Sequence, residues 1–176
     1  MRDTQKSRLY AADDVLRKYA KPMPEIEDME AFVKRVMTSK RVQASYPTAF
    51  AMYRKMPVVK DGRGRQAAGG WSGGITMPKW SRKTDVVIHE LAHCIAAREW
   101  CRERIAGHGW QFCSVYLRLV LLFIGREAHD ELKASFRKHR VRYTAPRKRR
   151  PLDPVAKAAL VARLAAYRQA QLQQAA

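Results

Sequence analysis

The sequence predicts an α+β fold, in which a small twisted sheet is supported by helices and followed by a helical tail. Three observations predict it. Helical apolar patterns occur both before and after residues 56–78, which are rich in glycine and β-branched residues. The composition becomes basic and then alanine-rich after residue 145. The length of 176 residues and the hydrophobic fraction of 47% suit one domain with an appendage. We therefore expect a domain over residues 1–145 and a separate segment over residues 146–176.

Two helices are expected in the N-terminal part of the domain, residues 1–40. Residues 4–20 have helical character, and the prolines of "KPMPE" end that run because proline cannot continue a helix. Residues 28–38 form a second helix. Its apolar side chains share one face, namely those of Met29, Phe32, Val33 and Val36.

The sheet and the site are expected within residues 56–143. The stretch "MPVVKDGRGRQAAGGWSGGITMP" predicts two or three short strands, with a hairpin at "KDGRGR". Pro78 should close the last strand. The side chain of Ser81 or Thr84 could then cap the helix that follows.

Three helices follow the strands, over residues 84–98, 110–124 and 126–140. The segment "APRKRRP", residues 145–151, is a basic linker bracketed by prolines. The residues after it are rich in alanine and strongly favour a helix. That final helix could pack on the domain, on a partner or on nothing.

The helix over residues 84–98 contains the motif His89-Glu90-Leu91-Ala92-His93. With a step of about 100° per residue, His93 lies about 40° from His89, and Glu90 lies about 100° from it. Most of the remaining surface is apolar, so the helix should be buried, and burying these polar groups is costly unless they have partners. Two histidines at i and i+4 can bind one divalent metal, while the glutamate can reach a water molecule beside it.

A catalytic zinc site requires a third protein ligand. His108, in "AGHGWQF", lies between two glycines that allow a tight turn back towards the metal helix. Glu127 and Glu131 on the later helix are rival third ligands, but they need a longer reach and leave the Gly-His-Gly unexplained.

The HExxH motif, followed after fourteen residues by a histidine in Gly-His-Gly-x-x-Phe, resembles the SprT-like (Spartan) zinc metalloprotease domain. Residues 58–143 are more similar still to the HExxH-motif metallohydrolases of actinobacteria and their phages. The specific motifs lie between Gly69 and Phe112, and neither the N-terminal helices nor the tail is covered.

The resemblance implies a minimal zincin fold with one zinc ion per chain. His89, His93 and His108 would be its ligands, and Glu90 would be the catalytic residue of a metalloprotease. The donor that stabilises the oxyanion stays open among Tyr116, His129 and Tyr143. In the proteases that the chain resembles, an edge strand just before the metal helix pairs with the substrate; here that stretch is "GGWSGGITMP", which could equally have no partner.

Other polar and aromatic residues near the motif are open to two interpretations. The neighbours His129, Asp130 and Glu131 could orient a ligand histidine or could form a solvated helix face. Four tryptophans flank the motif region, and we expect them in the core or in a pocket wall: Trp71, Trp80, Trp100 and Trp110.

The chain carries a net charge of +19, which favours association with polyanions such as nucleic acid. The tail from residue 147 contributes about +6 of it, so most of the charge belongs to the domain. The alternative function is therefore a basic nucleic-acid-associated protein whose zinc site is structural or vestigial. Glu90 favours the enzyme, because a closed structural site has no use for an unliganded glutamate.

The three cysteines are expected to be free thiols in a reducing cytoplasm: Cys94, Cys101 and Cys113. The N-terminal residues lack the apolar region of a signal peptide. The longest apolar stretch, residues 115–124, is too short to span a bilayer. The sequence thus predicts no membrane partner. The resemblance to metalloproteases implies a protein or peptide as substrate.

Overall fold

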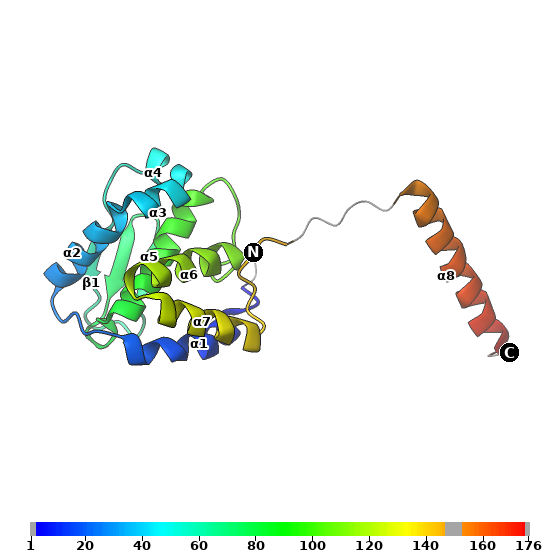
Figure 1. The fold of residues 1–176 in the computed structure, drawn as a ribbon, viewed down its shortest axis with the longest axis horizontal. Helices are drawn as coiled ribbons and strands as arrows, with labels where there is room; N and C mark the ends of the chain where they lie inside the picture. The colour runs from blue at the N-terminus through cyan, green and yellow to red at the C-terminus, as the bar shows by residue number, and fades with distance from the viewer. Residues whose placement is uncertain (1–2, 147–152, 175–176) are drawn as a thin grey trace. The chain divides into compact units, whose positions relative to one another are not determined.

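The computed structural model describes residues 3–146 and 153–174, and the chain forms two compact units, Met1–Ala145 and Pro146–Ala176. The first unit has the predicted α+β composition, with seven α-helices and one small mixed sheet among its described residues. Figure 1 shows this unit and, separately, the helix of the second unit.

The N-terminal part of the first unit has more helices than the sequence predicts. The helix predicted over residues 4–20 is α1 (Lys6–Asp13), continued by a 3-10 turn over Asp14–Tyr19. The second predicted helix is α2 (Ile26–Met37), and the shared face of its apolar residues is buried as expected. Two short helices were not predicted, α3 (Lys40–Ser45) and α4 (Pro47–Met52). Each has only six residues, too few to show an apolar period.

Three short strands form the predicted sheet: β1 (Val58–Asp61), β2 (Gly69–Trp71) and β3 (Gly74–Met77). Their order is β1-β3-β2, with β1 parallel to β3 and β2 antiparallel to it. The central strand β3 is buried along its whole length, and β2 lies at an edge.

The predicted hairpin at "KDGRGR" is wrong. A turn does form there, since Asp61 Oδ1 accepts the amide hydrogen of Arg63 at 2.9 Å. However, the chain after this turn crosses to the far side of β3, and the hairpin instead joins β2 to β3 through Ser72 and Gly73. Turn residues mark where the chain reverses but do not determine which strands pair.

The three helices that follow agree with their predictions: α5 (Thr84–Glu99), α6 (Trp110–Phe123) and α7 (Arg126–Lys138). The predicted cap of α5 is wrong, because the N-cap residue is Lys83 and no side chain caps the helix. Thr84 Oγ1 instead accepts a hydrogen bond from the amide of Lys21 at 2.8 Å, and Ser81 Oγ donates to the carbonyl of Pro78. The chain after α1 is thereby attached to the start of α5.

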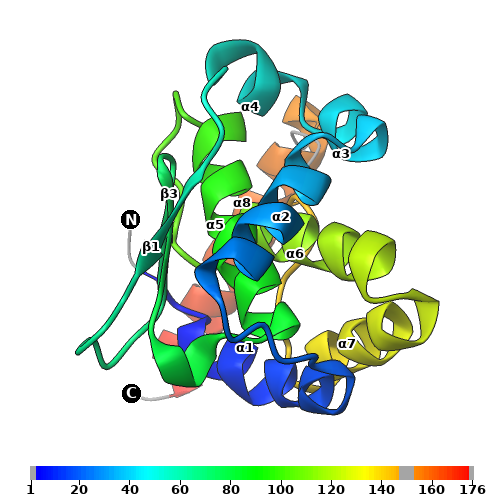
Figure 2. The same ribbon diagram turned by 90° about the vertical axis from the view of Figure 1, so that its left-hand side faces the viewer.

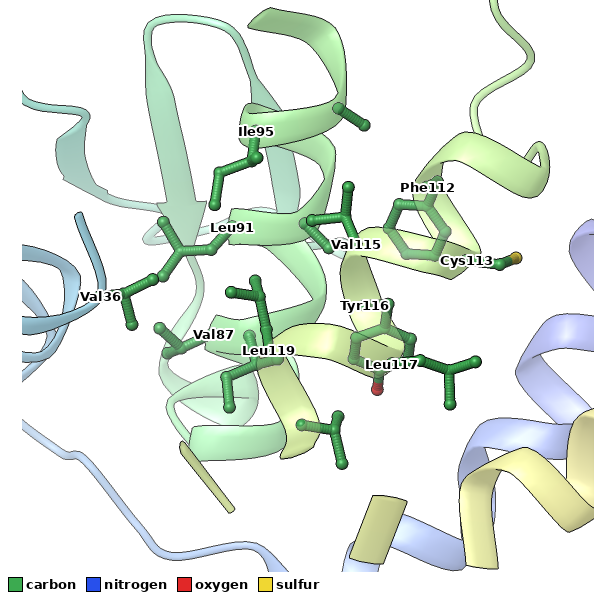
Figure 3. Close-up of a cluster of buried hydrophobic side chains, with 14 of the residues drawn as sticks. Val36, Val87, Leu91, Ile95, Phe112, Cys113, Val115, Tyr116, Leu117 and Leu119 are labelled. Atoms are coloured by element: carbon green, nitrogen blue, oxygen red, sulfur yellow. The ribbon is translucent and has the colours of Figure 1, made fainter. Parts of the chain in front are cut away.

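The helix α5 is buried because the sheet covers one side of it and α6 the other (Figure 2). Figure 3 shows Leu91 and Ile95 of α5 in this core, with Val36 of α2 and Val115 of α6. On the outside, α1 lies along α7 (Figure 1). This arrangement brings the N-terminal helix within reach of the motif on α5.

The second unit contains α8 (Pro154–Gln174), in the part of the chain where the sequence predicts a helix. The predicted basic linker lies almost wholly outside the described residues, since 147–152 are not described. The large apolar side chains described on α8 are all exposed: Val155, Leu160, Val161, Leu164, Tyr167 and Leu172. None of the described helices is both long enough and apolar enough to cross a membrane.

Candidate metal centre

Three histidines converge at the buried surface of α5. His89 and His93 are one helical turn apart, and His108 precedes α6 at the end of the connection from α5. One ring nitrogen from each histidine lies within 4.8 Å of the other two, which is the grouping of a metal site. The arrangement brings His108 to the pair, as predicted from the Gly-His-Gly turn.

Two carboxylates from the N-terminal segment lie within hydrogen-bond distance of Nδ1 in two of these rings. Asp13, the last residue of α1, places Oδ2 3.1 Å from Nδ1 of His89. Asp3 places Oδ2 2.6 Å from Nδ1 of His108 and also accepts the backbone amide of His108 at 3.2 Å. A carboxylate can only accept, so each Nδ1 carries a hydrogen, and in the neutral imidazole Nε2 then keeps its lone pair. That is the tautomer a metal requires.

The Nε2 atom of His108 is buried and has no hydrogen-bond partner among the described residues. A buried lone pair without a partner is costly, and a cation would remove the cost. Because all three donors are imidazoles, the set suits zinc, and three protein ligands would leave one coordination position for a non-protein ligand. The residues present therefore fit a divalent metal such as zinc.

The three rings cannot all be protonated at once. Burial, together with the nearby His89 and His108, lowers the pKa of His93 to about 2. Burial also lowers the pKa of His108, against the opposing hydrogen bond to Asp3. For His89, burial opposes the charged form, but the hydrogen bond to Asp13 and nearby carboxylates outweigh it and raise its pKa. The lowered pKa values of His93 and His108 thus favour the neutral rings, which are able to bind a metal.

Glu90 is the fourth polar residue of this buried surface, with only 7% of its area exposed. Burial, assisted by the charge of Asp13, raises the pKa of its carboxyl group, while His89 and a backbone hydrogen bond with Gly70 oppose the rise. Strand β2 lies so close here that any side chain on Gly70 would collide with the carbonyl oxygen of Glu90. The edge strand is therefore placed directly beside the motif.

A cavity of about 510 Å³ opens onto His89 and Glu90. Its walls include Tyr10 and Trp80, which are both partly exposed, and Asp85. The Tyr10 ring stacks on His89, with centroids 5.8 Å apart. A solvent-accessible cavity lined by Glu90 and by one of the three histidines, His89, can admit a substrate.

Only one of the three predicted oxyanion donors is at this site. Tyr116 lines the cavity, but its hydroxyl donates to Asp13 Oδ1 at 2.6 Å. His129 pairs with its neighbour Asp130 at 2.7 Å, and Tyr143 accepts a hydrogen bond from Arg137 at 3.3 Å. Neither His129 nor Tyr143 lines the cavity.

The rival third ligands lie elsewhere as well. Glu131 pairs with Lys18 at 2.6 Å, and Glu127 is exposed on α7. Of the two interpretations of His129, Asp130 and Glu131, the structure favours the solvated helix face, because the described carboxylate partners of His89 and His108 are Asp13 and Asp3.

The four tryptophans divide between core and surface. Trp80 lines the cavity, and Trp100 packs against Trp110 with centroids 5.6 Å apart. Trp71 departs from the expectation, since it is 38% exposed on β2 with Lys60 over its ring.

Sequence reasoning missed three residues of the site, Asp3, Asp13 and Tyr10. No spacing in the sequence relates them to the motif, because they lie more than seventy positions before their partner histidines. Asp13 lies inside the helix predicted over residues 4–20, and nothing in that pattern indicates its partner. Only the packing of α1 and the residues before it in the folded chain brings these side chains to the histidines.

No protein-family model, curated protein or solved structure gives a significant match to this chain.

Proposed function

We propose that the protein is a zinc-dependent metallohydrolase on a minimal zincin fold, and that it cleaves peptide bonds. The observation that carries the proposal is the buried Nε2 of His108, which lies beside His89 and His93 and has no partner among the described residues, together with a cavity that His89 and Glu90 line. The three histidines would hold one zinc ion. When bound, zinc would supply Lewis acidity, polarising the scissile carbonyl and acidifying the attacking water.

Asp13 and Asp3 would fix the orientation of two ligand rings by accepting their Nδ1 hydrogens. Each contact also favours the tautomer that leaves Nε2 free. Because Tyr116 donates to the other oxygen of Asp13, that carboxylate is held from two sides. These contacts would restrict the histidine rings before metal binding, so that less conformational entropy is lost when the metal binds.

Glu90 would act as the general base and then as the acid. Its carboxylate would take a proton from the attacking water and deliver it to the nitrogen of the leaving amine. Burial of Glu90 raises its pKa, which brings the carboxyl group closer to the range in which it both accepts and releases a proton.

Tyr10 would supply the donor for the developing oxyanion. Its ring lies against His89 at the cavity wall, and its side chain is 46% exposed. Burial and nearby carboxylates raise the pKa of its phenol, so the hydroxyl keeps its hydrogen at neutral pH. Tyr116 is less suited, because its hydroxyl is already bonded to Asp13.

Nucleic acid is a further proposed partner. Most of the +19 charge belongs to the first unit, so polyanion binding does not depend on the tail. The alternative function, a nucleic-acid-associated protein with a structural or vestigial zinc site, shares this feature. The cavity beside Glu90 supports the hydrolase over this alternative, because a structural zinc site has four protein ligands and no position open to a substrate.

The decisive experiment measures zinc content and peptide hydrolysis on the same preparations of wild type and Glu90→Gln. We expect the variant to keep its zinc, since Glu90 is not a ligand, and to lose about 10²–10⁴-fold in turnover. Glu127→Gln, on the surface of α7, is the matched control and should retain full activity. A wild type that binds zinc but hydrolyses no peptide or protein, with or without DNA, would support a structural zinc site instead.

A further inference from the structure

The buried, positively charged side chain of Arg98 lies in the last turn of α5, outside the candidate metal centre. Arg98 is 2% exposed and is the largest fully buried side chain of the described residues. Its Nε donates to the carbonyl of Ser72 at 2.6 Å. Among the described residues, its buried Nη1 has no hydrogen-bond partner, and no carboxylate forms an ion pair with the guanidinium.

A buried guanidinium that lacks a counter-ion is costly, because the charge loses water and gains no partner. The Ser72 carbonyl compensates in part, and so does the ring of Tyr53, whose centroid lies 5.1 Å from the guanidinium carbon. Neither supplies a negative charge. The guanidinium of Arg98 would therefore be stabilised by a bound anion.

Arg98 lines a cavity of about 320 Å³ that contains two more cations, Arg54 and Lys55. The other lining residues are neutral, and three of them carry polar side chains, Thr38, Gln43 and Tyr53. No acidic residue is among the described residues that line this cavity. A concave site with three positive charges and no negative one concentrates the field on whatever anion enters it.

We propose that this cavity binds a dianionic phosphate group. Nη1 of Arg98, whose donors have no described partner, can donate to a phosphate oxygen, and Arg54 and Lys55 supply further positive charge. Three cations attract a group with two negative charges more strongly than a group with one negative charge. The site shares no lining residue with the cavity at Glu90, so it stands whether or not the protein is a hydrolase.

Titration calorimetry of the full-length, zinc-bound protein with inorganic phosphate at low ionic strength tests the proposal. We expect saturable binding at one site. Arg54→Gln/Lys55→Gln should weaken it about tenfold or more, and Arg98→Met, which keeps the apolar stem, should weaken it at least as much. Arg54 and Lys55 are exposed, so the double variant tests the site even if Arg98→Met does not fold.

Two control variants distinguish binding in this cavity from general attraction to a basic surface and from binding at the metal centre. Arg102→Gln/Arg104→Gln removes the same charge from exposed positions outside the cavity and should leave binding unchanged. His93→Ala should also bind phosphate as the wild type does. The proposal fails if wild type shows no saturable binding, if the control pair weakens it equally, or if His93→Ala abolishes it. It fails as well if dimethyl phosphate, a monoanion, binds as tightly as inorganic phosphate.

Discussion

Asp3 places a carboxylate oxygen 2.6 Å from Nδ1 of His108, although the two residues are 105 positions apart in the chain. The contact joins the N-terminal segment to the third histidine of the candidate metal centre. It is reinforced by Gln5, whose side-chain amide donates to the backbone carbonyl of His108 at 2.6 Å. The residues before α1 thus take part in building the site.

Asp3→Asn should weaken zinc binding by about 10–100-fold, the range typical of losing a carboxylate behind a ligand histidine. Asp13→Asn should act in the same direction and also lose its charged acceptor for Tyr116. Competition with a chelator gives the affinity. The absorption spectrum of the cobalt-substituted protein reports ligand geometry, which a purely structural contact would not alter.

Asp14→Asn is the matched control for this pair of variants, because Asp14 adjoins Asp13 but its ion pair with Arg17 is exposed. Its zinc affinity should equal that of the wild type. Unchanged affinity and an unchanged cobalt spectrum in both Asp3→Asn and Asp13→Asn would show that neither carboxylate positions a ligand.

The identity of the third ligand is tested by zinc content. His108→Ala should lose most of the zinc, because two histidines alone bind the ion weakly. Glu127→Ala should keep it, since Glu127 is exposed on α7. Metal analysis after dialysis distinguishes the two. Full zinc in His108→Ala together with loss in Glu127→Ala would reverse the assignment.

If the positive charge binds nucleic acid, the affinity should not depend on the nucleotide sequence. It should fall steeply as the salt concentration rises, because binding releases counterions. Deleting residues 147–176 should reduce the salt slope without abolishing binding, since the first unit retains most of the charge. Fluorescence anisotropy with two duplexes of unrelated sequence measures both effects. Absence of binding to DNA and RNA at low salt would remove this partner.

Thiol labelling should distinguish the three cysteines. Burial raises the pKa of Cys94 to about 11 and that of Cys113 to about 12, so both stay protonated and inaccessible at pH 8. Cys101, which is partly exposed, should be the residue alkylated by iodoacetamide in the native protein. Mass spectrometry of peptides locates the label, and all three should react in denaturant. Rapid native labelling of Cys113 would contradict the packing of α6.

The sequence by itself determined the features that depend on near neighbours in the chain. The helical repeat places His89 and His93 on one face, and this follows from residues four apart. The apolar runs predicted α5, α6 and α7 with close boundaries, because each is long enough to show a period. Glycines on either side of His108 indicated its turn towards the motif.

The tertiary structure alone decided which distant segments meet. β1 pairs with β3 rather than β2 because the chain crosses the sheet after the turn at Asp61, which no local pattern reveals. Asp3 and Asp13 reach the histidines because the N-terminal segment is attached to α5 and to the loop that carries His108. Such contacts depend on how whole elements pack, and the same holds for Arg98, whose burial without a counter-ion follows from its neighbours in space.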